Sequence, residues 1–384
     1  MRAWSWSKSH GGLAESLGRA NAFGALRLML AGAVLVSHLF PLGYGRRDPL
    51  WAASGGQTDL GRLAVTGFFV LSGFLITASG RRTRPLRFLR NRALRIAPGL
   101  LAAVLVTGFV IMPVLYWQEH GGLGGFWEHP HGPLRYLLGA SPTDGSWDVS
   151  DVLVEGIERG TNHNANINGA LWSLKYEALC YLLVALFAVA GVLRRAPAML
   201  AVPAALLWVA ESAGWLFGRS LGGGPFHLAV PVVGEVSLGL AVDLAYAFLL
   251  GAAAQVHQRR LPVHDGLAVV CATALAASLW WGGLLPVGFP ALTYLTLWLA
   301  VRLPEPFRRI GRRQDYSYGV YIYGFAVEQG LAVFGVPRAG LFCYLVSAAV
   351  TTAGLALLSW HVVEAPALRL RGGFHRRPKE PSTS

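Results

Sequence analysis

The feature that most constrains this chain is a succession of apolar stretches, each about 17–25 residues long, the length that a helix needs to cross a bilayer. Ten such stretches cover residues 24–42, 62–80, 96–117, 170–192, 197–217, 237–256, 264–282, 285–302, 316–335 and 339–360. The 384-residue chain is 54% hydrophobic and only 14% charged, against about 25% charged in soluble proteins. The sequence therefore predicts an all-α polytopic membrane protein with about ten transmembrane helices.

The basic residues are distributed between these stretches in a pattern that indicates an orientation. With the N-terminus inside, the inner segments carry most of the arginines, in clusters within 81–95, 194–195, 259–260, 308–313 and 369–379. This positive-inside pattern predicts that both termini are cytoplasmic. Although the net charge is +13, the charges form short clusters and no single basic face, which argues against nucleic acid as a partner.

The apolar stretches also suggest a simple domain organisation. We expect a cytoplasmic leader at 1–23, a transmembrane domain at 24–365 and a basic, disordered cytoplasmic tail at 366–384. One long outer loop, at about 118–169, is rich in Gly, His, Asp and Asn. The cysteines lie within apolar runs and have neither disulfide nor metal-ligand spacing, so no metal site is expected.

The first stretch contains two costly ionisable residues, Arg27 and His38. A charge at the centre of a membrane helix costs about 2.5–3.5 kcal/mol even on lenient scales, so each residue is expected to have a function. Eleven residues bring the helix back to nearly the same face, about 20° off, and separate the two residues by roughly 16 Å. One helix face therefore presents a cation near its inner end and an imidazole near its outer end, too far apart to touch.

Two further segments have both a structural and a functional interpretation. Ser72-Gly73 lies within an apolar stretch, where a small-residue pair favours close helix packing over a nucleophile. Arg92 and Arg95 share a face just before the helix expected to open at Pro98. They either set topology and attract anionic lipid, or bind phosphate beside a helix N-terminus, and the two interpretations are compatible.

The fourth stretch opens with three polar residues, Ser173, Lys175 and Glu177. An intramembrane ion pair or an interfacial position would explain one or two of them. Three within five residues is too much polarity for lipid contact, so we expect them to face a water-filled cavity. Near the C-terminus, Glu364 before Pro366 would cap a helix or pair with the basic tail.

Taken together, these residues resemble the membrane-bound acyltransferase 3 family, which O-acylates bacterial surface glycans and some secondary metabolites. The matching elements occur in the family's order: Arg27 and His38 (Arg-x10-His), Phe68–Leu75 (FFVLSGFL), Arg92, Arg95 and Pro98 (R-x-x-R-I-x-P), Asn168–Glu177 (N-G-x-L-W-S-L-x-x-E), Tyr316–Tyr321 (Y-S-Y-G-x-Y), and Glu364 with Pro366 (E-x-P). The family also has ten spans. The chain departs from it at Thr66, where many members have aspartate, and at Gly324, where many have histidine.

The resemblance implies transfer of an acyl group, with acetyl the first choice, from acyl-CoA to a hydroxyl of a carbohydrate-containing acceptor. It implies His38 as the general base, with Glu177 either orienting the imidazole or holding the acceptor. Arg27, Arg92 and Arg95 would bind the phosphates of the donor, which is a co-substrate and not a bound cofactor. The remaining motif residues expected in the pocket or acceptor site are Ser72, Asn168, Trp172, Ser173, Tyr318 and Tyr321.

The donor would then come from the cytoplasm and the acceptor, a glycan, glycolipid or glycosylated small molecule, from the outer face of a bacterial inner membrane. The alternative is a transporter or flippase of a lipid-linked or glycan intermediate, which ten spans and intramembrane charges also fit. However, the two halves contain no matching pair of Gly/Pro-broken helices, which would be the best sequence signal of a transporter. Release of free thiol from acyl-CoA would separate the two functions.

Overall fold

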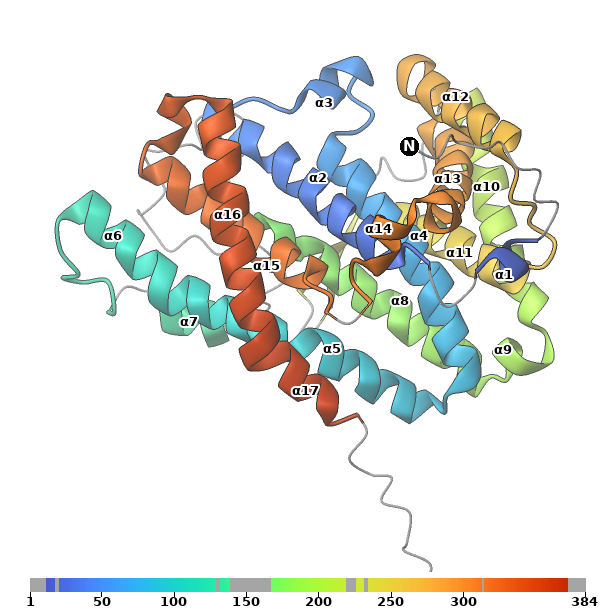
Figure 1. The fold of residues 1–384 in the computed structure, drawn as a ribbon, viewed down its shortest axis with the longest axis horizontal. Helices are drawn as coiled ribbons and strands as arrows, with labels where there is room; N and C mark the ends of the chain where they lie inside the picture. The colour runs from blue at the N-terminus through green and yellow to red at the C-terminus, as the bar shows by residue number, and fades with distance from the viewer. Residues whose placement is uncertain are drawn as a thin grey trace, which may run out of the picture.

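A computed structural model describes residues 12–17, 21–128, 132–138, 167–218, 226–230, 234–312 and 314–371 (Figure 1). Each of the ten predicted stretches forms a helix. In chain order the helices are α1 (Leu13–Ser16), α2 (Phe23–Tyr44), α3 (Pro49–Ala53), α4 (Leu60–Arg82), α5 (Pro85–Val106), η1 (Thr107–Ile111), α6 (Met112–His120), α7 (Pro133–Leu138), η2 (Gly169–Leu171), α8 (Trp172–Val189), α9 (Val192–Arg195), η3 (Pro197–Leu200), α10 (Ala201–Leu216), α11 (Leu238–Val256), α12 (Asp265–Trp281), η5 (Leu284–Gly288), α13 (Phe289–Arg302), α14 (Glu305–Arg309), α15 (Ser317–Val333), η6 (Val336–Ala339), α16 (Leu341–Ser359), η7 (Trp360–Glu364) and α17 (Ala365–Arg369).

The all-α membrane architecture is confirmed. Among the described residues, 8 helical segments are long and apolar enough to cross a membrane by length and composition. The other two predicted spans correspond to α12 and α15, each 17 residues long. The count of ten spans and the cytoplasmic position of both termini stay predictions.

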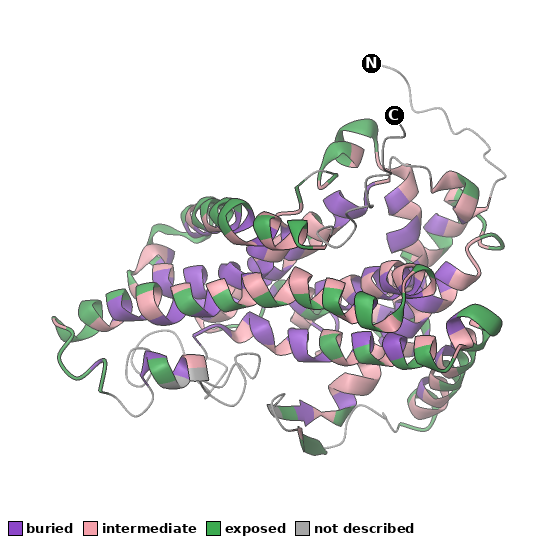
Figure 2. Cartoon of the chain, turned by 90° about the horizontal axis from the view of Figure 1, so that it is seen from below, coloured by how far each residue is buried: buried purple, intermediate pink, exposed green. Residues whose placement is uncertain are grey.

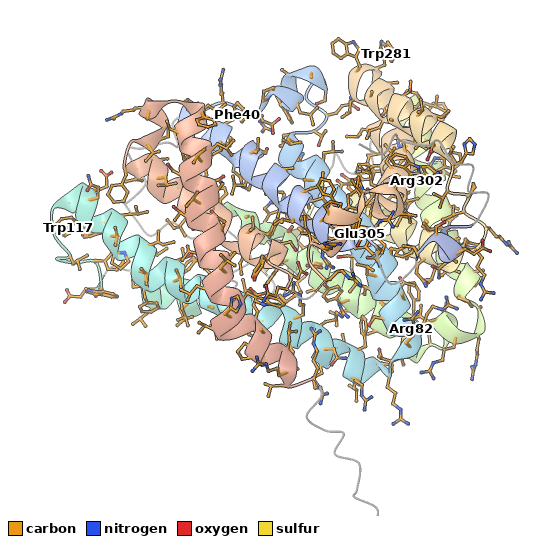
Figure 3. The ribbon with its side chains drawn as sticks, viewed as in Figure 1. Phe40, Arg82, Trp117, Trp281, Arg302 and Glu305 are labelled. Carbon is orange, nitrogen blue, oxygen red and sulfur yellow. The ribbon has the colours of Figure 1, made fainter. Side chains whose placement is uncertain are left out.

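Large apolar side chains are exposed on the outward faces of the peripheral helices, as expected where a helix contacts lipid. Examples are Leu105, Leu186, Leu206, Val270 and Val350. Figure 2 shows exposed and buried residues alternating along these helices, with the buried ones turned inward. In Figure 3, Phe40, Trp117 and Trp281 lie toward the left or the upper edge of the molecule, whereas Arg82, Arg302 and Glu305 lie further toward its lower right. The charge pattern assigns the first group to the outer side and the second to the inner side.

A close contact between α4 and α11 forms the middle of the molecule. A Cβ atom on Gly73 would lie 1.9 Å from the carbonyl oxygen of Phe248, and one on Gly251 would lie 2.1 Å from that of Val70. Only glycine allows two backbones to approach so closely. Gly73 is therefore a packing residue, as the Ser72-Gly73 pair predicts. On the other side of α4, helix α2 packs between α4 and α15.

The helix that carries the basic motif starts earlier than expected. We placed its N-terminus after Arg95, but α5 begins at Pro85, with Pro98 inside it. Proline is well suited to the first turn of a helix, and within a membrane helix neighbouring groups tolerate an interior proline. Arg92 and Arg95 are therefore interior helical residues, and the predicted helix N-terminus beside them is wrong.

The described residues also contain a short antiparallel hairpin that the all-α prediction missed. Strands β1 (His227–Val230) and β2 (Gly234–Ser237) pair with Val236 opposite Leu228. Each strand has four residues, too few for alternation to stand out in the sequence. The hairpin leads directly into α11.

The described residues cover parts of the predicted leader, outer loop and tail. The short helix α1 packs against the turn before α12, since the amide of Leu13 donates to the carbonyl of Leu261 (2.8 Å). The third span continues to His120, and α7 follows it. Residues 139–166 of the predicted outer loop and 372–384 of the tail lie outside the described residues.

Candidate active site

A pocket opens between α2, α4, α5, α8 and α15 and encloses about 860 Å³ of empty space, including its open mouth. Its apolar walls come mainly from α4, including Phe68 and Leu75. Eight residues singled out from the sequence line it together: Arg27, Ser72, Arg92, Arg95, Ser173, Glu177, Tyr318 and Tyr321. The motifs therefore converge on one site, although they are spread over nearly 300 residues, from Arg27 to Tyr321.

Two arginines of the pocket are held by carboxylates. Arg27 Nη2 lies 3.1 Å from Asp315 Oδ2, and Arg95 Nη2 donates to the same oxygen at 2.8 Å. Arg95 Nη1 donates to Glu364 Oε2, also at 2.8 Å. Glu364 is nearly fully buried, and among the described residues its ion pair is with Arg95 of α5. Its side chain makes no cap hydrogen bond at the start of α17, so the helix-cap expectation is wrong. A short ion-pair network therefore joins α2, α5, η7 and the segment before α15.

Asp315 is the centre of this network and lies outside the predicted spans. Burial acts to raise the pKa of its carboxyl, but the guanidinium groups of Arg27 and Arg95 and hydrogen bonds from Ser317 outweigh burial, so the pKa is lowered. Ser317 Oγ donates to Asp315 Oδ1 at 2.6 Å. Asp315 is therefore an anion in the folded protein.

Glu177 faces the wall of the same pocket. Its Oε1 accepts hydrogen bonds from Ser72 Oγ (3.0 Å) and from the hydroxyl of Tyr181 (2.5 Å), one helical turn further along α8. Of the three polar residues that open the fourth stretch, Ser173 and Glu177 line the pocket. Lys175 does not, because its Nζ donates to the backbone carbonyl of Glu235 in the hairpin. The predicted cavity is thus correct for two of the three.

Tyrosines of α15 form another wall of the pocket. Tyr318 donates to the carbonyl of Ile96 (2.8 Å), and its ring centroid lies 5.3 Å from Arg95 Cζ. Tyr321 donates to the carbonyl of Ala170 (2.8 Å), and Ser173 Oγ lies 2.5 Å from its hydroxyl. These bonds fix α15 against α5 and the start of α8.

His38 lies outside the pocket lining, beyond Tyr321, with a different carboxylate. Its Nδ1 is 3.7 Å from Oε2 of Glu328, and its ring packs edge-on against Phe325 (centroid distance 4.9 Å). Glu328 is 0% exposed, and neither carboxylate oxygen has a hydrogen-bond partner among the described residues. Of the two roles expected for Glu177, orienting the imidazole does not fit this geometry, because Glu177 is bonded to Ser72 and Tyr181, whereas α15 places Glu328 beside His38.

The face of α2 predicted from the sequence is present in the structure. Arg27 contacts Asp315 and His38 contacts Glu328, so both residues of α2 face the chain segment 315–328. That segment presents Asp315, Tyr318, Tyr321, Phe325 and Glu328 at intervals of three or four residues, which places them along one side. α2 and α15 thus connect the arginine end of the site with the histidine end.

Besides His38, two predicted site residues do not line the pocket. The side chain of Asn168 donates to the backbone carbonyl of Ile322 (2.8 Å) and so joins the start of η2 to α15. Trp172 packs edge-on against Tyr176, with ring centroids 5.8 Å apart. The described residues contain no group of three or more His, Cys, Asp or Glu side chains placed to bind a metal ion.

Four residues of the site had no role in the sequence analysis. Tyr181 follows Glu177 at i+4, a spacing that signals contact on a helix. Asp315 and Glu328 stand near the two ends of the tyrosine-rich segment DYSYGVYIYGFAVEQ, where each was visible as an isolated charge. Arg371, whose Nη2 donates to the carbonyl of Asn91 (2.6 Å), gave no signal apart from the general basicity of the tail.

The helical fold defines a multi-pass membrane protein, and its buried, charged pocket is typical of an enzyme active site. Residues 21–361 match the acyltransferase 3 family, described as an acyltransferase domain, and the chain belongs to this family. It is similar to an O-acetyl transferase of Shigella phage Sf6, with 28% identity over 353 residues that cover 90% of this chain and 95% of the relative. It is also similar to nodulation protein 10 of Rhizobium leguminosarum bv. viciae, with 29% identity over 377 residues (93% and 95%). No solved structure gives a significant match. Acyl transfer, with O-acylation as its form, is thereby supported as the activity.

Proposed function

We propose that this protein moves an acetyl group from cytoplasmic acetyl-CoA to a hydroxyl of a carbohydrate-containing acceptor at the outer face of a bacterial plasma membrane. One observation carries the proposal. Arg27 and His38 of α2 face Asp315 and Glu328, so that a cationic pocket and a partly buried imidazole lie along one line. The name of the phage relative, O-acetyl transferase, supports acetyl as the group transferred.

The donor would enter at the arginine end. Acetyl-CoA combines a phosphate-rich nucleotide with a long, uncharged pantetheine arm. Arg27, Arg92 and Arg95 offer guanidinium groups to the phosphates. The apolar wall of α4 suits the arm, and Glu177 is placed to accept a hydrogen bond from one of its amide N–H groups.

His38 would act as the general base. Its imidazole takes the proton of the acceptor hydroxyl as the oxygen attacks the thioester carbonyl. Collapse of the tetrahedral intermediate breaks the carbon–sulfur bond, and the departing thiolate takes the proton from the imidazolium to give free CoA thiol. Glu328, whose Oε2 lies 3.7 Å from Nδ1, is a positioning residue. Its carboxylate favours the imidazolium that exists between the two proton transfers.

The distance between the two ends sets the path of the thioester. From Asp315 to Glu328 the chain rises by about 20 Å if helical throughout, which the extended arm would have to cover from the arginine end. Tyr321 and Phe325 stand between the pocket and His38 on that side of α15, so their side chains must rotate for the thioester to pass. We place the donor on the cytoplasmic side because the positive-inside pattern assigns the arginine end to it.

The experiment uses membranes that contain the full chain, supplied with acetyl-CoA labelled in its acetyl group. The expected result is label in a glycan or glycolipid fraction, together with an equal amount of free CoA thiol. His38→Ala should reduce transfer by about 10²–10⁴-fold. His361→Ala, which removes an exposed imidazole hydrogen-bonded to the carbonyl of Leu357, serves as the matched control. Thiol release that His38→Ala leaves intact would refute the assignment of the base, and movement of a glycan without thiol release would indicate a transporter.

A further inference from the structure

The arginines around the pocket differ in how their charges are balanced. Arg27 and Arg95 contact carboxylates, with Asp315 shared between them. Arg92 has no carboxylate contact among the described residues: its Nη2 donates to the hydroxyl of Ser79 (3.3 Å), and its Nε is buried without an acceptor. Arg92 therefore carries an uncompensated charge into a partly buried site.

A second arginine of the same kind lies beside it. Arg371 follows α17, which packs against α5 (Figure 1). Its Nη2 donates to the carbonyl of Asn91, the residue before Arg92, and its Nε is also buried without an acceptor. Burial, together with the positive charges of Arg92 and Arg95, lowers the pKa of Arg371 to about 10. Two guanidinium groups without described counterions thus lie at one edge of the donor pocket.

This arrangement is costly unless an anion completes it. Like charges in a partly buried site repel each other, and each buried N–H without an acceptor loses the free energy of its solvation. A group that accepts several hydrogen bonds and carries negative charge removes both penalties. A phosphate does so best, because its oxygens match the planar fork of a guanidinium.

We propose that Arg371 and Arg92 form a phosphate-binding site that holds the nucleotide end of acyl-CoA, while the pantetheine arm continues into the pocket. The inference rests on the proposed donor. Arg92 belongs to both the pocket lining and this site, which gives the ligand a continuous route from one to the other. Because Arg27 and Arg95 are already neutralised, the phosphates gain most from Arg92 and Arg371.

Another hollow with arginines lies near the start of α15 and is lined by Arg309, Arg312 and Asp315 among others. Arg309 is 75% exposed and already lies 3.5 Å from Glu305, and Arg312 is exposed as well. A phosphate would gain little from charges so well solvated. The partly buried pair Arg92 and Arg371 is the stronger site.

The test measures binding and needs no acceptor. The purified full chain in phosphatidylcholine nanodiscs is titrated with CoA and with pantetheine, which lacks the nucleotide and its phosphates. Arg371→Ala should weaken CoA about tenfold or more, the lower range for a hydrogen bond to a charged group, and Arg371→Lys should restore part of the loss. Pantetheine should bind wild type and variant alike. Arg369→Ala, an exposed arginine two residues earlier, makes the same change in net charge and should leave CoA binding unchanged.

Each other outcome has a definite meaning. Equal CoA binding by wild type and Arg371→Ala overturns the inference while leaving the proposed donor intact. Failure of the wild type to bind CoA overturns the donor itself. Loss of CoA binding in Arg309→Ala or Arg312→Ala, with none in Arg371→Ala, would assign the nucleotide to the hollow at α15. A parallel titration with phosphatidylglycerol nanodiscs separates the sources of phosphate: if Arg371→Ala alters only stabilisation by this lipid, the occupant is a lipid headgroup and the assignment to the coenzyme is wrong.

Discussion

Nδ1 of His38 lies 3.7 Å from Oε2 of Glu328, a carboxylate that has no exposed surface and no hydrogen-bond donor among the described residues. A buried carboxylate without a hydrogen-bond donor is expensive, so its presence beside the only histidine of α2 needs a functional reason. Stabilisation of a transient imidazolium is such a reason.

Glu328→Gln keeps the shape of the side chain and removes its charge. We expect kcat to fall by about 10²-fold, the lower range for assisted proton transfer, with KM for acetyl-CoA unchanged. The melting temperature should not fall, since a costly buried group is replaced by a neutral one. The matched control is Tyr344→Phe, because the Tyr344 hydroxyl donates only to the backbone carbonyl of Glu328. A variant that retains kcat but unfolds more easily would make Glu328 a purely structural residue.

Arg95→Ala should act mainly on stability. The substitution leaves Glu364 buried without its cation, which typically costs about 3–5 kcal/mol, and leaves Asp315 with Arg27 alone. Adding Glu364→Gln to Arg95→Ala removes the stranded charge and should recover part of the loss. Thermal unfolding in detergent measures both effects. If the double variant is less stable than Arg95→Ala by the full cost of a second single substitution, the two residues are not coupled.

The pairing of Asp315 predicts a pH dependence. Because its pKa is lower in the folded protein than in the unfolded chain, its contribution to stability is complete above the ordinary carboxyl range near 4 and disappears as pH falls through the lower, folded value. Asp315→Asn should therefore be less stable than wild type by a constant amount from about pH 8 to pH 5, and the difference should shrink below about pH 4. Melting temperatures of both proteins across this range test the sign. A difference that grows on acidification would contradict it.

The contact between α4 and α11 predicts a strict requirement for glycine. Gly73→Ala would place a methyl group 1.9 Å from the carbonyl oxygen of Phe248, so α4 and α11 must separate and the protein should lose its folded yield in membranes. Gly32→Ala is the control, since no atom lies within 4 Å of the added methyl group. That variant should be neutral or more stable by up to about 1 kcal/mol, because alanine favours helices over glycine. Normal yield of Gly73→Ala would show that the two helices have room to separate.

Most of the architecture was predictable because lipid imposes a simple rule: each spanning segment satisfies its own hydrogen bonds and shows this as an apolar run. The shared face of Arg27 and His38 followed from helical geometry alone. The partners of Arg27 and His38 could not be predicted, because no local sequence pattern shows which helix packs against α2. The start of α5 was not predictable because a run of arginines between two apolar stretches suggests a loop, although arginine is a good helix former. Lys175 was misassigned because its partner belongs to the short hairpin.

The pocket, too, was predictable only in part. Its residue types came from motifs, but the assignment of carboxylates to cations depended on tertiary structure. Asp315, Glu177 and Glu328 were all visible as isolated charges near apolar runs. The fold pairs Asp315 with the arginines, Glu177 with Ser72 and Tyr181, and Glu328 with His38. Spacing within a helix is readable from sequence, whereas pairing between helices is not.

The contacts between α2 and the segment 315–328 also limit how these helices can change in length. Inserting or deleting a single residue between Tyr318 and Glu328 would turn everything beyond it by about 100° and shift it by about 1.5 Å, so Glu328 would leave His38 while Asp315 kept Arg27. The same holds for a residue gained or lost between Arg27 and His38. Substitutions along these segments can accumulate one by one, but the number of residues between the paired positions has to be inherited intact.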